Sequence, residues 1–270
     1  MKDDIKKNFS KGSKTYDDNA NVQKYMIDML LDSLPKKEYM NILEVGCGTG
    51  LLTSKLRTLF PSAKLTCVDI SEGMIDVCKD KLQDENIEFI CCDIERHCPI
   101  DEFDLIISSA VLQWITDLPS VLETLKSRLS YGGVLAFSTF ATKTFKELDT
   151  SLNHIFEKND LTVRQNRNYY SKIELSELVL DIFKDDLYII TNDYKMYVEY
   201  FKNALKFLKS VKAIGANSSE VSKYITPIMT KEIIEYYNQN YSLKDSSNEE
   251  FRSFVYATYY LLFYVIEKIN

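Results

Sequence analysis

Glycine, proline and long apolar runs are scarce in this sequence of 270 residues. With 8 Gly and 5 Pro, the chain is neither collagen-like nor rich in Gly/Pro linkers. No apolar run reaches the roughly 18 to 20 residues that a membrane-spanning helix needs. The first residues, Met1 to Ser10, are charged rather than apolar. We therefore expect neither a signal peptide nor a membrane span, and a cytoplasmic protein.

An excess of positive charge is also missing. Lys and Arg together number 33 against 40 Asp and Glu, a formal net charge of -7. Nucleic acid and anionic membrane surfaces are therefore not expected partners. The 45% hydrophobic and 12% aromatic content instead predicts a compact folded protein. At about 150 residues per domain, the length suits one or two domains.

Residues that bind metals or act as bases at neutral pH are few. The 2 histidines, His97 and His154, lie in no motif, and we interpret both as ordinary surface or core residues. No CxxC pair and no His/Cys cluster is present, so we expect no metal site. Apolar, strand-like surroundings favour reduced core thiols for the 6 cysteines, which are Cys47, Cys67, Cys78, Cys91, Cys92 and Cys98.

Between residues 40 and 140, short apolar runs alternate with amphipathic stretches. This alternation is typical of a parallel sheet flanked by helices and predicts a doubly wound α/β core. The predicted strands are Asn41 to Cys47, Lys64 to Asp69, Ile87 to Asp93, Phe103 to Ala110 and Val134 to Phe140. The predicted helices, each with start or stop signals, are Gly50 to Phe60, Ser71 to Leu82 and Leu118 to Leu129.

The segments on either side of this core are rich in predicted helix. Before it, a polar arm, Lys11 to Asn19, precedes an amphipathic helix over Ala20 to Leu34. After it come helices over Thr144 to Glu157, Ile173 to Phe183, Tyr200 to Ala213 and Lys231 to Tyr241, a strand near Leu187 to Tyr197 and a terminal strand over Val255 to Lys268. Because these helices contain little Gly or Pro, we expect a cap packed on the sheet rather than a tethered domain.

The sharpest motif is the strand that runs from Ile42 into Gly46, Cys47, Gly48, Thr49 and Gly50. Its glycines permit a tight turn and a close approach of a ligand to the backbone, although a purely structural turn between strand and helix stays an alternative. The spacing is GxGxG rather than the GxGxxG that holds a pyrophosphate. Glu44, two residues before the first glycine, would repel a diphosphate and favours a ligand with positive charge. A nicotinamide oxidoreductase is therefore disfavoured.

Acidic residues also follow the next two predicted strands. Asp69 ends one strand, where its carboxylate can accept hydrogen bonds from both hydroxyls of a ribose. Asp93 ends the following strand, where it can accept from an exocyclic amine while Ile94 packs on a purine ring. Each acid alone is equally well a solvated strand end or a helix cap. Together, at successive strand ends, they predict a site for a ribose and a base.

Across residues 40 to 140 this arrangement resembles the class I S-adenosylmethionine-dependent methyltransferases. The resemblance implies a Rossmann-like, mostly parallel sheet with an antiparallel last strand. It implies one domain, with an N-terminal arm and helix over residues 1–38 and a cofactor-binding core over 39–140. A helical cap would follow over 141–250, with one core strand near 187–197, and a terminal strand over 251–270.

The same resemblance implies which residues hold the cofactor S-adenosylmethionine. Gly46, Gly48 and Gly50 would line its methionine part, and Asp69 would bind the ribose. Ile70 and Met74 would flank the adenine, Asp93 and Ile94 would meet its edge, and Ser109 to Gln113 would face the sulfonium. The full set of expected cofactor-binding residues is Gln23, Glu44, Gly46, Cys47, Gly48, Gly50, Asp69, Ile70, Met74, Asp93, Ile94, Ser109 and Gln113.

A narrower resemblance covers nearly the whole chain. Its residues are Phe9, Tyr16-Asp17, Ala20, Val22-Gln23, Ser109 to Trp114, Phe137 to Phe140, Thr144 to Leu148 and Leu208 to Ala216. Together they resemble the malonyl-[acyl-carrier protein] O-methyltransferases of biotin synthesis. That family commonly has Arg-Phe-Tyr-Ser where this chain has Asn168-Tyr169-Tyr170-Ser171, with Arg167 displaced by one position. The role of an arginine there is therefore open.

The family resemblance implies methylation of the free carboxylate of a malonyl thioester, giving the methyl ester that primes pimeloyl assembly. A carboxylic acid with a pKa of about 4 is ionised at pH 7, so the reaction needs no general base. Tyr16 is our candidate for a catalytic hydroxyl donor, with simple packing of the arm as the alternative. Trp114, Phe140, Phe145 and Arg167 are candidate substrate-binding residues, and Trp114 suits a core anchor equally well.

The lysines between Lys195 and Gly215 provide a candidate docking surface. This stretch has five lysines and one acid, Glu199, against the overall charge of -7. Within the predicted helix, Lys202, Lys206, Lys209 and Lys212 follow one face, which suits an acidic carrier protein. The alternative is an ordinary solvated helix face.

Two other functions stay open on the sequence alone. One is a class I methyltransferase of another small carboxylic acid or metabolite. The other is a non-catalytic module that binds the cofactor or the carrier protein. In each case we expect a monomer, and under the leading hypothesis it meets malonyl-acyl-carrier protein transiently.

Overall fold

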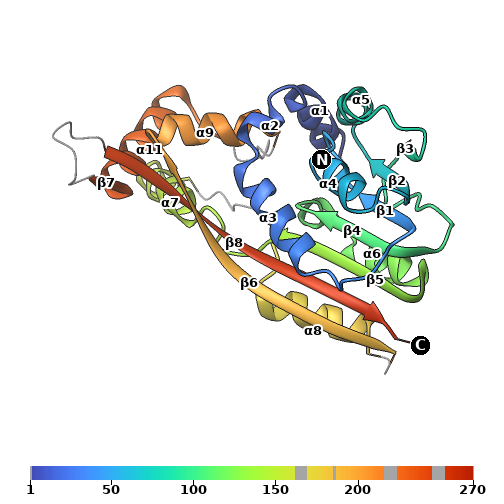
Figure 1. Cartoon of the computed structure of the whole chain (residues 1–270). Coiled ribbons are helices and arrows are strands. Elements are labelled where there is room, and N and C mark those ends of the chain that lie inside the picture. Colours follow the sequence, from blue (N-terminus) through green and yellow to red (C-terminus); the bar gives the residue numbers. More distant parts are fainter. Residues whose placement is uncertain (1, 162–168, 185–186, 216–223, 245–252, 270) are drawn as a thin grey trace.

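The computed structural model describes residues 2–161, 169–184, 187–215, 224–244 and 253–269. Its centre is an 8-stranded sheet in the order β3-β2-β1-β4-β5-β8-β6, with β7 paired to β8 (Figure 1). Strands β1 to β5 run parallel, and β8 is antiparallel to both β5 and β6. The α/β fold with an antiparallel last strand is therefore confirmed. The strands are β1 Asn41–Val45, β2 Lys64–Asp69, β3 Ile87–Cys91, β4 Phe103–Ser109, β5 Leu129–Phe140, β6 Tyr188–Phe201, β7 Ser242–Lys244 and β8 Ser253–Lys268.

Helices cover both faces of this sheet. One face packs against α3 (Asn21–Asp32), α4 (Leu51–Leu59) and α5 (Glu72–Lys81). The other packs against α6 (Leu118–Ser127) and α8 (Lys172–Ile182). Alternate strand side chains thus enter two different hydrophobic clusters, as expected for central strands buried on both faces. The carboxyl ends of β1, β2 and β4 meet at one edge, and the motif residues follow them.

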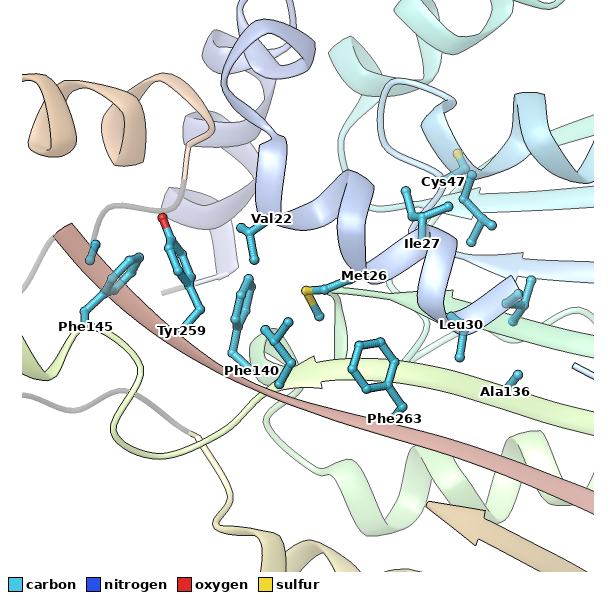
Figure 2. Close-up of a cluster of buried hydrophobic side chains, with 14 of the residues drawn as sticks. Val22, Met26, Ile27, Leu30, Cys47, Ala136, Phe140, Phe145, Tyr259 and Phe263 are labelled. Atoms are coloured by element: carbon cyan, nitrogen blue, oxygen red, sulfur yellow. The ribbon is translucent and has the colours of Figure 1, made fainter. Parts of the chain in front are cut away.

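The first hydrophobic cluster is continuous from the sheet into the cap. The cap helices are α7 (Lys146–Lys158), α9 (Ala204–Ala213) and α11 (Pro227–Asn240). Val22 and Met26 of α3 lie beside Phe140 and Tyr259 (Figure 2), and the same cluster includes Phe207 of α9. Because each fully buried side chain of this size contributes roughly 1.5–3 kcal/mol, the cluster joins cap and core energetically.

The boundary between β6 and α9 differs from the prediction. Strand β6 continues to Phe201, paired with Val255 of β8, and α9 begins at Ala204 rather than Tyr200. The side chain of Asn203 caps the helix by accepting a hydrogen bond from the Lys206 N–H at 3.0 Å. The expectation that Lys202 belongs to the helix is therefore wrong. The long pairing with β8 overrides the helical periodicity of the sequence.

The N-terminal arm is more regular than the sequence indicated. It forms α1 (Lys2–Gly12) and a short α2 (Tyr16–Asn19) ahead of α3. Helix α1 lies against α5, where the Ser10 and Ser71 hydroxyls are 2.8 Å apart. Figure 1 places the arm between α5 on one side and α9 on the other. The arm therefore bridges the core and the cap.

Candidate active site

The glycine motif forms the turn between β1 and α4. Gly46, Gly48 and Gly50 have φ angles of +79°, +55° and +87°, which L side chains rarely adopt. A Cβ on Gly46 would lie 2.2 Å from a Val111 methyl, and one on Gly50 would lie 2.7 Å from the Cys78 sulfur. A Cβ on Gly48 would meet no atom within 4 Å. Gly46 and Gly50 thus serve close packing, whereas Gly48 leaves open space beside the turn.

Asp69 connects the end of β2 to this turn. Its two carboxylate oxygens accept hydrogen bonds from the Gly48 N–H at 2.9 Å and the Ser71 N–H at 2.8 Å. Burial raises the pKa of Asp69, and the backbone N–H groups of Ser71 and Gly48 partly counter that effect. The carboxylate therefore holds the glycine turn in place while it also faces the cavity described next.

A cavity of about 780 Å³ lies at the carboxyl ends of β1, β2 and β4. This is the edge of an open α/β sheet at which ligands bind. Its lining residues are Lys2, Ile5, Phe9, Tyr16, Val45, Gly46, Gly48, Val68, Asp69, Ile70, Met74, Cys92, Asp93, Ile94, Glu95, Ser109, Ala110, Val111, Trp114 and Ile115. We call it the larger cavity.

A smaller cavity of about 420 Å³ adjoins the larger one. Phe9, Tyr16, Ala110 and Trp114 line both, so these residues form the partition between them. The lining of the smaller cavity is largely aromatic and, within the described residues, contains no Lys, Arg, Asp or Glu. Its lining residues are Phe9, Tyr16, Gln23, Ala110, Gln113, Trp114, Phe140, Thr144, Phe145, Tyr169, Ile214 and Tyr259.

Side-chain contacts hold the arm over the partition. The Thr49 hydroxyl donates to Asp17, and Lys81 pairs with Asp17 while donating to the Thr49 carbonyl at 2.9 Å. Deeper in the site, the rings of Phe9 and Trp114 meet edge to face with centroids 5.5 Å apart. The arm is thereby fixed to the glycine turn on one side and to the cavity wall on the other.

The end of α9 contacts the arm at backbone distance. A Cβ on Gly12 would lie 2.8 Å from the Ala213 carbonyl oxygen, and one on Gly215 would lie 2.9 Å from the Asn8 carbonyl oxygen. Gly215 also has a φ of +74°. The Thr15 hydroxyl donates to the Ala213 carbonyl at 3.0 Å. Two glycines thus let the cap helix approach the arm directly before Tyr16.

Tyr16 stands between the two cavities. Burial raises the pKa of its hydroxyl, and the carboxylates of Asp69 and Asp17 raise it further. The phenol therefore keeps its proton throughout the physiological range. It can donate a hydrogen bond but cannot act as a base near neutral pH.

The far end of the larger cavity carries acidic groups paired with α1. Lys2 donates to Asp93 at 2.6 Å and also pairs with Glu95. Burial works against the charge of Lys2, but its hydrogen bonds to Asp93 and Glu95 raise its pKa overall. Glu95 also accepts from the N–H groups of Thr116 and Asp117. The first turn of α1 therefore closes this end of the cavity.

Gln113 stabilises the turn after β4. Its amide nitrogen donates to the Ala110 carbonyl at 2.6 Å, and its oxygen accepts from the Thr139 hydroxyl at 3.0 Å. Ala110 has a φ of +57°, an uncommon conformation for a residue with a Cβ. Backbone strain of this kind is often found at functional sites, and here it lies in the partition.

Comparison with known proteins identifies the family. Residues 36–203 match a model described as a methyltransferase domain. The malonyl-[acyl-carrier protein] O-methyltransferase 1 of Ilyobacter polytropus is 38% identical over 270 residues, which are 98% of this chain and 94% of that protein. The chain belongs to the malonyl-[acyl-carrier protein] O-methyltransferase family. The resemblance inferred from the sequence is therefore confirmed.

Two further relatives define how far the similarity extends. The family member of Bacillus anthracis is 36% identical over 98% of this chain and 96% of its own length. The plantazolicin methyltransferase BpumL, solved with SAH, matches with a TM-score of 0.52 at 18% identity, over 96% of this chain and 90% of that one. At that identity the structural match supports the methyltransferase fold alone.

The structure places most of the expected site residues of this methyltransferase around the two cavities. Those lining the larger cavity are Tyr16, Gly46, Gly48, Asp69, Ile70, Met74, Asp93, Ile94, Ser109 and Trp114. Those lining the smaller cavity are Tyr16, Gln23, Gln113, Trp114, Phe140 and Phe145. Gln23 and Gln113, expected beside the cofactor, thus lie on the smaller cavity and not on the larger one.

Other expected residues lie elsewhere. Glu44, Cys47 and Gly50 line neither cavity. Glu44 is buried beneath the glycine turn, where burial raises its pKa to about 7 and the Cys67 thiol donates to it at 3.6 Å. Its carboxyl group is therefore directed to Cys67 of β2 and to neither cavity. Lys202, Lys206, Lys209 and Lys212 are exposed on the outside of the cap, and Arg167 lies outside the described residues.

Several cavity residues were not predicted as site residues. Lys2 and Ile5 come from a helix that the sequence did not reveal, and Tyr259 comes from the middle of a strand with no motif. Phe9, Thr144 and Ile214 do fall in the segments that carried the narrower family resemblance. That resemblance was thus a usable signal for part of the smaller cavity.

Within the described residues, His, Cys, Asp and Glu form no group of three that could hold a metal ion, and none of the helices is long and apolar enough to cross a bilayer.

Proposed function

We propose that this chain uses S-adenosylmethionine to methylate the free carboxylate of malonyl-[acyl-carrier protein]. The product is the malonyl methyl ester thioester that primes pimeloyl assembly in biotin synthesis. Family membership across 98% of the chain supports this assignment. The observation that carries it is the adjoining pair of cavities, one with strand-end acids and one aromatic and free of described charged residues.

The larger cavity fits S-adenosylmethionine. Gly48 leaves space for the methionine part, the Asp69 carboxylate suits the ribose hydroxyls, and the side chains of Ile70, Met74 and Ile94 provide apolar walls for a purine. When bound, the cofactor supplies an electrophilic methyl group on a positively charged sulfur. Its positive charge suits a cavity whose lining has three acidic residues, Asp69, Asp93 and Glu95, against one lysine, Lys2.

The smaller cavity suits a carboxylate that loses its charge during the reaction. The malonyl carboxylate, with a pKa of about 4, is already ionised at pH 7 and needs no base. Its negative charge falls in the transition state, so a fixed cation would stabilise the starting state more than the transition state. Aromatic walls and neutral donors avoid that penalty and exclude water. The work of the protein is then to orient the acceptor.

Tyr16 is the proposed catalytic hydroxyl donor. It lies in the partition between the cavities, and its raised pKa keeps the proton available for donation. The Tyr16→Phe substitution is expected to lower kcat about 10-fold, the equivalent of one hydrogen bond to a charged group, while cofactor affinity changes less than about 3-fold. Steady-state kinetics and cofactor titration check this. A wild-type kcat in Tyr16→Phe would contradict the assigned role.

The exposed lysines of α9 form the proposed docking surface for the acidic carrier protein. Lys206, Lys209 and Lys212 are exposed, and α9 contacts the arm at its C-terminal end. Lys202 lies just ahead of the helix and extends the same basic stretch. We propose that arm, core and cap act as one domain, and that the protein is a monomer that meets its carrier transiently.

Methyl transfer from labelled S-adenosylmethionine tests the function directly. Malonyl-acyl-carrier protein should be methylated far faster than free malonate, other small acids or malonyl-coenzyme A, and the chain should restore biotin independence to cells lacking their own malonyl methyltransferase. Preferential labelling of a free acid would favour the second candidate, a methyltransferase of another small carboxylic acid. Absence of transfer to every acceptor, with intact cofactor binding, would favour a non-catalytic module.

A further inference from the structure

Gln23 is buried in the wall of the smaller cavity. It belongs to α3, is 5% exposed, and is one of the residues, with Tyr16, that line the smaller cavity. It does not line the larger cavity. The position of this amide therefore relates it to the acceptor rather than to the cofactor.

The side-chain amide of Gln23 does not use its full hydrogen-bonding capacity among the described residues. Its oxygen is buried and unpaired. Leaving such a group unpaired lowers stability, and the great majority of buried polar groups are paired for that reason. A buried amide with an unpaired oxygen in a cavity wall is thus a candidate binding group.

Other polar side chains of the smaller cavity are already engaged. Gln113 bonds to Ala110 and Thr139, and the Thr144 hydroxyl donates to the Tyr260 carbonyl at 3.1 Å. The Tyr259 hydroxyl donates to Glu199 at 3.2 Å. These groups hold the wall together and have donors committed to the protein. Gln23 differs from them because its amide oxygen is unpaired.

We infer that Gln23 binds the carboxylate of the acceptor and selects for it, an inference that rests on the proposed function. The amide group carries two N–H donors, and a half-turn of the side-chain amide exchanges the positions of its nitrogen and oxygen. A carboxylate oxygen accepts from this nitrogen while the phenol of Tyr16 provides a second neutral donor. Recognition by neutral donors leaves the carboxylate reactive, whereas a lysine or arginine would hold it in its charged starting state.

Such a site should reject an acyl group that lacks the carboxylate. A site built to hydrogen-bond a group discriminates strongly against the analogue without it, because its own polar atoms then stay unpaired. Malonyl- and acetyl-acyl-carrier protein differ in this carboxylate alone and share the same carrier. The ratio of their affinities therefore measures carboxylate recognition and cancels the contribution of carrier docking.

Fluorescence of Trp114 gives a readout that does not depend on turnover. The chain has 1 Trp, and Trp114 lines both cavities. With S-adenosylhomocysteine present, titration with each carrier thioester should show wild type favouring malonyl over acetyl about 10-fold or more. In Gln23→Leu this preference should shrink to about 3-fold or less, and in Gln23→Glu it should reverse, because two carboxylates repel. The affinity for S-adenosylhomocysteine should change less than about 3-fold in both.

Gln239→Leu is the matched control, since Gln239 is exposed on α11; it should keep the wild-type ratio. Because Gln23→Leu removes an unpaired buried group, its melting temperature should equal or exceed that of wild type. A wild-type malonyl preference in Gln23→Leu, or no preference in the wild type, would overturn the inference. If Gln23→Leu is strongly destabilised, the milder Gln23→Met variant is titrated instead. A wild-type ratio of malonyl to acetyl affinity in Gln23→Met would also overturn the inference. Failure of methyl transfer alone would instead count against the proposed function, because the binding ratio is measured without it.

Discussion

The two cavities of this methyltransferase are assembled in different ways. Most of the larger cavity comes from residues 45–115, in turns that directly follow parallel strands. The smaller cavity draws single residues from positions as distant as Phe9, Phe140, Ile214 and Tyr259. The first is a product of local turns on a sheet, and the second exists only when arm, core and cap pack together. Damage to a motif should therefore act on cofactor binding, and damage to packing should act on the acceptor side.

The largest effect on ligand affinity is expected from a change in the larger cavity, where we place the cofactor. Asp69→Asn weakens both the ribose acceptor and the hold on the glycine turn, so affinity for S-adenosylhomocysteine should fall about 100-fold. Asp104→Asn is the matched control, because Asp104 also accepts two backbone N–H groups, at Met40 and Asn41, far from the cavities. Calorimetric titration measures both. Equal losses in the two variants would show that general stability, and not the site, was affected.

The next prediction tests whether packing of the arm determines the shape of the smaller cavity, where we place the methyl acceptor. Gly215→Ala places a Cβ 2.9 Å from the Asn8 carbonyl and displaces the arm, so the rate of methyl transfer should fall about 30-fold while cofactor affinity falls only about 3-fold. Gly132→Ala is the control, with a similar φ of +69° but no atom within 4 Å. Steady-state kinetics on both variants separates displacement of the arm from backbone strain. Similar losses in both would remove the arm from the explanation.

A third change examines the buried acid of the motif. Because burial raises the pKa of Glu44 to about 7, the folded protein keeps this proton at pH values where the unfolded chain releases it. Wild-type stability is therefore lost as the pH rises from about 4.5 to 7. Glu44→Gln lacks this loss, and its free energy of unfolding should exceed that of wild type by about 3 kcal/mol at pH 8 and by little at pH 4.5. Denaturant titrations at both values check the trend, and a pH-independent difference would contradict it.

The smallest effect concerns the surface of the cap. Charge reversal at Lys206 and Lys209 should raise the KM for malonyl-acyl-carrier protein about 3- to 10-fold at low salt, with less effect at high salt. Cofactor affinity should not change. Lys64→Glu serves as the control, since Lys64 is the first residue of β2 and the cavities lie at the opposite, carboxyl ends of the strands. Unchanged affinity for the carrier would exclude α9 as the docking surface.

The sequence predicted the strands and turns around the larger cavity well because their determinants are local. The strand over Lys64 to Asp69 was predicted to the residue, and the glycine turn and the strand-end acid Asp69 lie where their spacing indicated. In this region periodicity and turn chemistry agree with the tertiary fold. The sequence did not indicate that Glu44 lies outside both cavities, because a motif gives the position of a carboxylate along the strand and not the side to which it turns.

The cap was predicted less well because long-range pairing decides it. A helix was expected to begin at Tyr200, but Tyr200 and Phe201 belong to β6, because pairing with β8 continues to Phe201. Tyr259 lines the smaller cavity, although its strand has no motif that distinguishes it from an ordinary core strand. The charged first turn of α1 gave no sign that Lys2 would pair with Asp93 and Glu95. Such contacts join residues far apart in the chain, and no local pattern encodes them.

The uninterrupted pairing of β6 and β8 limits how the protein can move. The two strands pair from Tyr188 with Lys268 through Phe201 with Val255, and so run from the core into the cap as one ribbon (Figure 1). A ribbon of this kind has no hinge, so the cap cannot swing away from the core without breaking strand pairing. Opening is then expected from the arm, which is held by side-chain contacts such as those of Ser10, Lys2 and Asp17 rather than by strand pairing. We therefore expect release of the spent cofactor to require movement of the arm.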